Sequence, residues 1–231
     1  MVCEQIIFQS DKLLLSGTLH RPEVEHPALV IGCHGLLSSS ESPKQIELAK
    51  ACNALGLAFF RFDHRGCGQS EGLFNEVTSF EGRCNDLKSA LEQMRARSDL
   101  GRKRGLFGSS MGGAVCLAVA AEYAPSSLVT VAAPLRSRSI VIPEDHSEAF
   151  TPRLLQFDIQ EKLSKIAKIY IFHGDADAVV PPSQAVEIYN RAGEPKKITL
   201  QKNGDHRMCR RSHQTGFVSA AAGWFYDCFY L

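Results

Sequence analysis

The sequence predicts an α/β fold with a mostly parallel, eight-stranded sheet flanked by helices. The first observation is that short runs rich in β-branched and aromatic residues alternate with longer segments of helical periodicity. The second is that several short runs are continuously apolar, which is typical of strands buried on both faces. The 231 residues fit one domain, so we expect a single domain over residues 1–231.

The first half of the chain supplies half of the expected strands. Residues 5–8 and 13–20 lie close together and predict an antiparallel hairpin at a sheet edge. Residues 28–33 are continuously apolar and predict a central strand. Residues 43–56 have helical spacing and end in glycine, and residues 57–62 follow as the next buried strand.

The second half continues the alternation. A glycine-rich loop at 66–72 precedes a helix over 79–97, and strands at 103–107 and 127–132 flank a helix over 110–123. A strand at 166–172, a helix at 182–192, a strand at 198–201 and a helix at 217–230 complete the chain. Residues 135–157 are rich in Arg, Ser, Pro and acidic residues, so we expect a short cap segment there, above the sheet and within the same domain.

Composition and charge exclude several classes of protein. The net charge of +1, with 22% charged and 44% hydrophobic residues, is typical of a soluble globular protein and gives no electrostatic footprint for nucleic acid or an anionic membrane. The most apolar unbroken stretch, residues 114–121, is far shorter than the roughly 20 residues that span a bilayer. The first residues show no export signal, so we expect a cytoplasmic protein.

The eight cysteines indicate reduced thiols rather than a metal site, because no Cys-x-x-Cys pair or zinc-finger spacing occurs. Cys33, Cys52 and Cys116 lie in apolar stretches, where free cysteine behaves as a small core residue. Cys67 lies between two glycines in the 66–72 loop, and an exposed thiol is the less favoured alternative for it.

A Gly-x-Ser-x-Gly pentapeptide at residues 108–112 follows an expected strand and opens an apolar helix. Such a turn holds its serine in strained backbone geometry and needs small neighbours so that strand and helix can approach. Ser110, and not Ser109, has glycines at both ±2 and is the candidate nucleophile. The alternative is a simple glycine-rich turn.

A serine nucleophile needs a base that is oriented by an acid. Residues 173–181 follow a buried strand, and we take Asp177 as the orienting acid, with Asp175 as the competitor that would instead hydrogen-bond loop amides. His206 follows the last strand and is the expected base, whereas His213, in the region of the terminal helix, is the weaker candidate. The order serine, acid, histidine, each at a strand end, favours this assignment.

The reaction also needs donors for an oxyanion. The loop that begins with His34 and Gly35 directly follows the central strand and can present a backbone N–H beside the nucleophile. We therefore assign the oxyanion hole to the backbone amides of Leu36 and Met111. We expect His34 to shape this loop rather than to act in catalysis.

Together these segments resemble the α/β-hydrolase superfamily over nearly the whole chain. The matching residues, in the superfamily's order, are His34-Gly35, the stretch 63–70, the pentapeptide 108–112, residues 173–177 and residues 204–206. The 63–70 stretch, Asp-x-Arg-Gly-x-Gly-x-Ser, looks like that of the serine aminopeptidase, monoacylglycerol lipase and cinnamoyl esterase branches. The resemblance implies a structural turn there, with no catalytic role for Asp63, Arg65 or Ser70.

The resemblance further implies acyl-enzyme chemistry on Ser110, without a metal or an organic cofactor. Many lids of the superfamily are larger than the 135–157 segment, so we expect a comparatively open site, which argues against a long-chain lipase with interfacial activation. The charged residues of this segment are expected to be solvated surface groups, with recognition of a charged substrate as the alternative. They are Arg136, Arg138, Glu144, Asp145 and Glu148.

The function that we expect is a serine hydrolase, a carboxylesterase for small or aromatic esters or for thioesters. A peptidase of the serine aminopeptidase type is the nearest alternative, and a noncatalytic binding protein on the same fold is the alternative of another class. The expected partner is a small-molecule ester substrate, without nucleic acid or membrane. A homodimer is left open.

Overall fold

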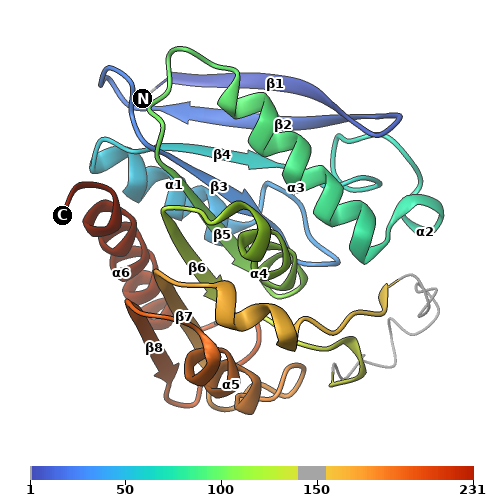
Figure 1. Cartoon of the computed structure of the whole chain (residues 1–231), viewed down its shortest axis with the longest axis vertical. Helices are drawn as coiled ribbons and strands as arrows, with labels where there is room; N and C mark the ends of the chain where they lie inside the picture. Colours follow the sequence, from blue (N-terminus) through green and yellow to red (C-terminus); the bar gives the residue numbers. More distant parts are fainter. Residues whose placement is uncertain (1, 140–154) are drawn as a thin grey trace.

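The computed structural model describes residues 2–139 and 155–231, and within them the chain folds around one eight-stranded sheet in the order β1-β2-β4-β3-β5-β6-β7-β8 (Figure 1). The strand β2 runs antiparallel to β1 and β4, and all pairs from β4 through β8 are parallel. This confirms the expected fold class. The strands are β1 (Val2–Ser10), β2 (Leu13–Arg21), β3 (Leu29–Cys33), β4 (Ala58–Phe62), β5 (Arg104–Ser109), β6 (Ser127–Val131), β7 (Ile169–Gly174) and β8 (Lys196–Gln201).

Helices cover both faces of the sheet (Figure 1). One apolar cluster lies between the sheet and α1 and α6, and the other packs the opposite face against α3, α4 and α5. No helix in the described ranges has the length and apolar character that a membrane crossing requires. The helices are α1 (Pro43–Ala54), α2 (Phe74–Val77), α3 (Phe80–Arg95), α4 (Met111–Tyr123), α5 (Ser183–Arg191) and α6 (Arg211–Tyr230).

The expected edge hairpin is confirmed and is longer than predicted. Pairing runs from Val2 opposite Arg21 to Ser10 opposite Leu13, and β1 is the edge strand. Side chains of β1 alternate between solvent and core, with Ile6 and Phe8 buried and Ile7 exposed. This alternation follows from a strand that has one face on the core and one face in water.

Several elements differ from the sequence predictions. The short helix α2 lies between the expected loop at 66–72 and the expected helix at 79–97, where no element was predicted. Strand β7 begins at Ile169 rather than at residue 166, because Lys168 adopts a left-handed φ of 55° just before it. The terminal helix begins at Arg211, six residues before the expected residue 217. Its first turns lie on the surface with polar side chains all round, so they carry no apolar periodicity.

The expected cap segment 135–157 lies largely outside the described residues, as do Glu144, Asp145 and Glu148. The points where the chain leaves and returns are held together. Arg136 forms an antiparallel bridge with Asp158, and Phe157 stacks on Phe80 with ring centroids 4.2 Å apart. The start and end of the segment are thus anchored beside α3 and the end of β6.

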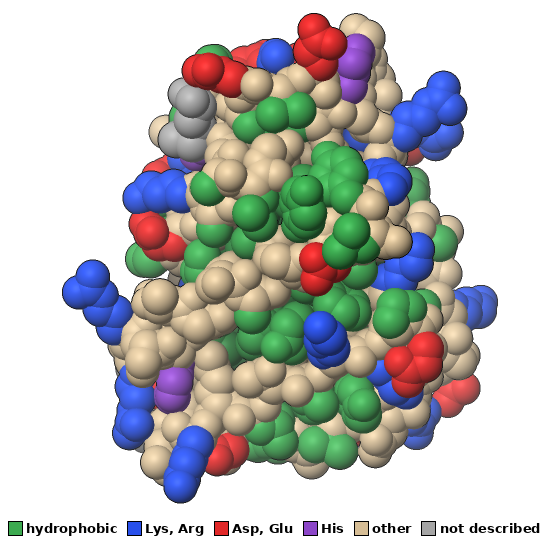
Figure 2. Space-filling view, turned by 90° about the vertical axis from the view of Figure 1, so that its left-hand side faces the viewer, with side chains coloured by type: hydrophobic (Ala, Val, Ile, Leu, Met, Phe, Trp, Pro, Cys, Tyr) green, Lys and Arg blue, Asp and Glu red, His purple; other side chains and the backbone are tan. Residues whose placement is uncertain are grey.

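The two ends of the parallel strands present different surfaces. Figure 2 shows the side that carries the ends of α1 and α6, where hydrophobic side chains gather over the centre and charged side chains lie among and around them. The exposed apolar side chains at these helix ends are Leu55, Tyr226, Tyr230 and Leu231. The carboxyl ends of β3, β5, β7 and β8 lie at the other edge of the sheet, where the candidate site is built.

Candidate active site

Ser110 lies in a sharp turn between β5 and α4. Its backbone has φ 53° and ψ −123°, a conformation that is strained for a residue other than glycine. The turn closes because its neighbours are glycines: a Cβ at Gly108 would lie 2.3 Å from the carbonyl oxygen of Gly112, and one at Gly112 would lie 2.3 Å from that of Cys33. The pentapeptide is therefore a strand-to-helix elbow, not a generic glycine-rich turn, and it leaves the side chain of Ser110 half-buried at the sheet edge.

His206 joins Ser110 to Asp177 across the loops that follow three strands. Its Nε2 lies 3.0 Å from Oγ of Ser110, and its Nδ1 lies 2.8 Å from Oδ2 of Asp177. With Nδ1–H donating to the carboxylate, Nε2 is the nitrogen that can accept the serine proton. The structure therefore brings together all three residues that the sequence order singled out.

Asp177 is buried and held by four donors. Oδ1 accepts from the amides of Val179 and Val180, each at 2.8 Å, and Oδ2 faces His206 and, at 3.1 Å, Nε2 of His173. Burial alone would raise the pKa of Asp177, but the hydrogen bonds from His173 and His206 outweigh it and hold the pKa well below its ordinary value. The carboxylate is therefore ionised at neutral pH and can stabilise an imidazolium.

The competing residues lie elsewhere. Asp175 is exposed and accepts a hydrogen bond from the amide of Asn203 at 2.6 Å, which is the loop role that we considered for it. His213 lies within α6, and its carbonyl accepts from Nε2 of Gln201. The histidine that contacts Ser110 is therefore His206, and the carboxylate that contacts this histidine is Asp177; Asp175 and His213 take neither position.

The loops that carry the acid and the base are joined directly. The amide of Ala176 donates to the carbonyl of Gly204 at 3.0 Å, and that of Asp175 donates to Gln201 at 3.1 Å. A Cβ at Gly174 would lie 2.1 Å from the carbonyl oxygen of Gly204, so only glycine permits this contact. The spacing between Asp177 and His206 thus depends on backbone packing between the two loops.

His173 is a site residue of the 173–177 stretch for which no role was predicted. It is fully buried, and its Nε2 lies 2.9 Å from the carbonyl oxygen of Val180 and 3.1 Å from Asp177. A proton on Nε2 is shared between these two acceptors and braces the carboxylate alongside His206. Its position one residue before the end of β7 is the only feature of the sequence that could have indicated a role in the site. Its contacts with Asp177 and Val180 depend on how the 175–180 loop folds back toward the strand.

The expected oxyanion donors lie next to the elbow. Met111 is the first residue of α4, and a Cβ built at Gly35 would lie 3.6 Å from that of Ser110. Within the described ranges, the amides of Leu36 and Met111 donate no hydrogen bond to another residue. Backbone N–H groups without a protein partner beside a nucleophile are the donors that an oxyanion hole needs, and the assignment of these two amides stays a prediction.

His34 shapes the loop, as expected. Its Nδ1 donates to the carbonyl of Gly35 at 2.7 Å, and its Nε2 accepts from the amide of His64 at 3.0 Å. Burial is the main cause that lowers the pKa of His34 well below its ordinary value, so the ring is neutral, as this bonding pattern requires. Both ring nitrogens are thus used in holding the backbone.

The 63–70 stretch forms a structural turn. The carboxylate of Asp63 accepts from the amides of Ser40 at 2.6 Å and Gln69 at 3.0 Å, and Ser70 donates to the carbonyl of Asp63 at 2.6 Å. Arg65 pairs with the buried Asp86. Cys67 is 8% exposed, so the alternative of an exposed thiol was wrong, and burial raises its pKa.

The arginines of the expected cap segment face other protein groups. Arg136 forms an ion pair with Glu187 of α5, while Arg138 is 74% exposed and lies 3.9 Å from Asp158. Arg138 agrees with the surface interpretation, whereas Arg136 is only 22% exposed and belongs to a partly buried ion pair rather than to a solvated surface. Eight free cysteines occur in the chain, and no cluster of three or more His, Cys, Asp or Glu able to hold a metal occurs among the described residues.

The fold and the site geometry define an α/β hydrolase, and comparison with known proteins agrees. The family model described as "Serine aminopeptidase, S33" matches residues 24–157. This match covers more than half of the chain, so the protein belongs to the serine aminopeptidase family of α/β hydrolases.

Among curated proteins, the uncharacterized protein Rv2307c of Mycobacterium tuberculosis is 29% identical over 188 residues, covering 78% of this chain and 63% of that protein. YfhR of Escherichia coli O157:H7 is 31% identical over 152 residues, covering 64% of this chain and 52% of that protein. The palmitoyl-protein thioesterase ABHD10 of Bos taurus is 25% identical over 210 residues, covering 78% of this chain and 67% of that protein. The chain thus spans only about half to two thirds of the length of these relatives.

Solved structures share the fold at low sequence identity. Est1E from Butyrivibrio proteoclasticus, solved with ferulic acid bound, has a TM-score of 0.84 and 18% identity, with coverage of 97% of this chain and 99% of that one. Mouse ABHD10 has a TM-score of 0.72 and 20% identity, with coverage of 96% and 98%. These similarities support the fold of the whole chain.

Proposed function

We propose that this protein is a serine hydrolase that cleaves small or aromatic carboxylic esters, or thioesters, through an acyl-enzyme on Ser110. The observation that carries this proposal is the continuous relay from Oγ of Ser110 through His206 to Asp177, with contacts of 3.0 and 2.8 Å. Nucleophile, base and orienting acid lie at hydrogen-bonding distances, as acyl transfer requires.

The chemistry follows from these positions. His206 Nε2 accepts the Ser110 proton while Oγ attacks the substrate carbonyl carbon, and the amides of Leu36 and Met111 stabilise the resulting oxyanion. The imidazolium then protonates the leaving alcohol or thiol, and the acyl group stays on Ser110. Water, deprotonated by His206, attacks this ester; the carboxylic acid leaves and Ser110 regains its proton.

Two similar proteins suggest the acyl and leaving groups. Est1E was solved with ferulic acid, an aromatic acid, and ABHD10 is named a palmitoyl-protein thioesterase. Their chemistry supports testing aromatic esters and thioesters first. Acyl specificity depends on the shape of the pocket, so a substrate panel must decide between them.

The decisive experiment is labelling with a fluorophosphonate probe, followed by turnover of esters and thioesters of increasing acyl length. We expect an adduct on Ser110 in the wild type, and neither adduct nor turnover in Ser110→Ala, which should retain the fold by circular dichroism. A wild-type protein that forms no adduct would support a noncatalytic binding protein. Turnover retained in Ser110→Ala would place the nucleophile elsewhere.

A peptidase is the second candidate, because the matching family model is described as a serine aminopeptidase. Amide cleavage requires protonation of a poorer leaving group than an alcohol or thiol. Rates with p-nitrophenyl acetate and an amino-acid p-nitroanilide, measured side by side, separate the two activities. Faster turnover of the anilide would reverse our ranking.

A further inference from the structure

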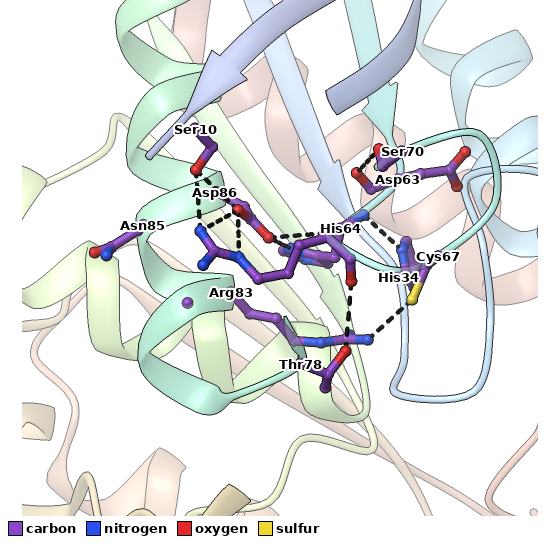
Figure 3. A network of polar contacts seen from close by, with 12 residues as sticks. Ser10, His34, Asp63, His64, Cys67, Ser70, Thr78, Arg83, Asn85 and Asp86 are labelled. Atoms are coloured by element: carbon purple, nitrogen blue, oxygen red, sulfur yellow. Dashed lines mark hydrogen bonds and ion pairs between the residues drawn. The ribbon is translucent and has the colours of Figure 1, made fainter. Parts of the chain in front are cut away.

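Arg83 is a fully buried arginine next to the oxyanion loop, residues 34–37 (Figure 3). It lies in the first turn of α3, and its guanidinium points toward this loop. Nη2 donates to the carbonyl oxygen of Leu36 at 3.0 Å and to Sγ of Cys67 at 3.3 Å, and Nη1 lies 3.4 Å from the carbonyl oxygen of Gly35. The guanidinium therefore holds two consecutive carbonyls of the loop.

The charge of Arg83 has no carboxylate in direct contact among the described residues. The neighbouring carboxylate, Asp86, is occupied by other donors: Ser10 at 2.8 Å, His64 at 3.2 Å and three nitrogens of Arg65. Burial lowers the pKa of Arg83, and Cys67 and Asp86 act against this shift. A buried charge without a direct counterion is costly, so its retention calls for a specific reason.

The contacts of Arg83 fix the direction of the peptide that joins Gly35 to Leu36. A trans peptide points its C=O and N–H in opposite directions, so a carbonyl held by His34 and Arg83 turns the N–H of Leu36 away from them. Gly35 also lies against Ser110, where a Cβ would approach that of the serine to 3.6 Å. The N–H of Leu36 is one of the two expected oxyanion donors.

We propose that Arg83 is a positioning residue that fixes the oxyanion loop and strengthens the N–H of Leu36 as a hydrogen-bond donor. A cation at a peptide carbonyl polarises the whole amide, and hydrogen bonds in series strengthen one another in a low-dielectric interior. Arg83 acts through the loop and does not touch the substrate. The inference rests on the proposed hydrolase function, because it concerns the stabilisation of the same tetrahedral intermediate.

The chain offers a matched control in Arg104, which also donates to backbone carbonyls but lies at the start of β5, the end of the strand away from Ser110. Its Nη2 bonds the carbonyl oxygen of Met94 at 3.0 Å, and its Nη1 bonds that of Gly101. Arg104→Met removes comparable contacts without reaching the oxyanion loop. Cys67→Ala is a second control, because it removes the thiol contact of Arg83 and leaves both carbonyls in place.

The test compares Arg83→Met and Arg83→Lys with these controls on p-nitrophenyl acetate and on the matching thionoester. Sulfur accepts hydrogen bonds more weakly than oxygen, so a thionoester gains less from an oxyanion hole. We expect Arg83→Met to lower kcat about 100-fold with little change in KM, which is the range for losing one oxyanion donor. The preference for the oxoester should fall about tenfold, and Arg83→Lys should restore part of both.

The outcomes are distinguishable. Equal losses on oxoester and thionoester, or a loss in Arg104→Met as large as in Arg83→Met, would overturn the inference and leave Arg83 a purely structural residue. An unchanged kcat in Arg83→Met would overturn it as well. If Arg83→Met does not fold, the ratio of oxoester to thionoester rates in Arg83→Lys decides the question. A wild-type protein without esterase activity or a fluorophosphonate adduct would instead refute the proposed function.

Discussion

Replacing Asp177 with asparagine should disable the site by exchanging one carboxylate oxygen for an NH₂ group. In the wild type, Oδ2 accepts a hydrogen bond from Nδ1–H of His206, which leaves Nε2 free to accept the proton of Ser110. The other oxygen, Oδ1, accepts from the amides of Val179 and Val180. In the Asp177→Asn variant, we expect the side-chain carbonyl oxygen to remain on these amides, so the NH₂ group takes the place of Oδ2 and faces the imidazoles of His206 and His173.

The consequence is a reversed tautomer. An NH₂ group facing Nδ1 makes this nitrogen an acceptor, so the proton moves to Nε2, which can then no longer accept the serine proton. The same change in serine proteases with a Ser-His-Asp triad lowers kcat about 10⁴-fold, equivalent to about 5 kcal/mol in the activation free energy. We expect a loss of this size for Asp177→Asn, with the fold retained.

The matched control is Asp175→Asn, which makes the same change two residues away in an exposed side chain that bonds only the amide of Asn203 among the described residues. The assay is kcat/KM on p-nitrophenyl acetate, with the unfolding midpoint in urea measured for both variants. We expect the control to stay within about twofold of the wild type, as for a surface substitution. Equal losses in the two variants, or less than a tenfold loss in Asp177→Asn, would refute the tautomer argument.

Three further predictions concern backbone strain, glycine packing and pH. Ser110→Gly should raise the free energy of unfolding by about 1 kcal/mol in urea titrations while abolishing activity, because glycine relieves the strained φ of 53°; no gain in stability would contradict the strain. Gly216→Ala should stabilise α6 by about 1 kcal/mol, because nothing lies within 4 Å of the new Cβ. Gly112→Ala should instead lower both stability and activity, because its Cβ would lie 2.3 Å from the carbonyl oxygen of Cys33. Burial, and then the charge of Arg61, lowers the pKa of His20 to about 4, below the value of about 6.5 in an unfolded chain. Between these two values the unfolded state binds more protons, so the free energy of unfolding should fall by about 2 kcal/mol from pH 7 to pH 5 through this group, and His20→Asn should remove that part of the pH dependence.

The sequence order was sufficient to predict the meeting of Ser110, Asp177 and His206. The carboxyl ends of parallel strands share one edge of a sheet, so loops that follow such strands converge even when they lie far apart in the chain. Ser110 and His206 are 96 residues apart, yet their side chains lie within hydrogen-bonding distance. The positions of the three residues after strand ends therefore predicted that they meet, and the glycines of the 108–112 elbow predicted the strained turn at Ser110.

The residues around the triad were harder to predict because their roles depend on side-chain direction. Arg83 has helical spacing with Leu87 and Ala90, which are buried on α3, so a charge on an apolar helix face was a visible anomaly. The helical spacing predicts that Arg83 is buried, but it does not predict that the guanidinium contacts the oxyanion loop. That contact depends on how α3 packs beside β3, which no local pattern encodes.

Two anchors hold the oxyanion loop against the elbow, and they differ in kind. On one side, Gly112 packs so closely that its missing Cβ would lie 2.3 and 2.5 Å from the carbonyl oxygens of Cys33 and His34, which fixes the start of the loop against α4. On the other side, the guanidinium of Arg83 holds the carbonyl of Leu36 at 3.0 Å and lies 3.4 Å from the carbonyl of Gly35, whose peptide carries the N–H of Leu36. Glycine packing sets distance but not the rotation of the following peptides, whereas a planar donor such as a guanidinium sets their orientation. We propose that close packing and a buried charge occur together here because an amide of Leu36 acting as an oxyanion donor would need both a fixed position and a fixed direction.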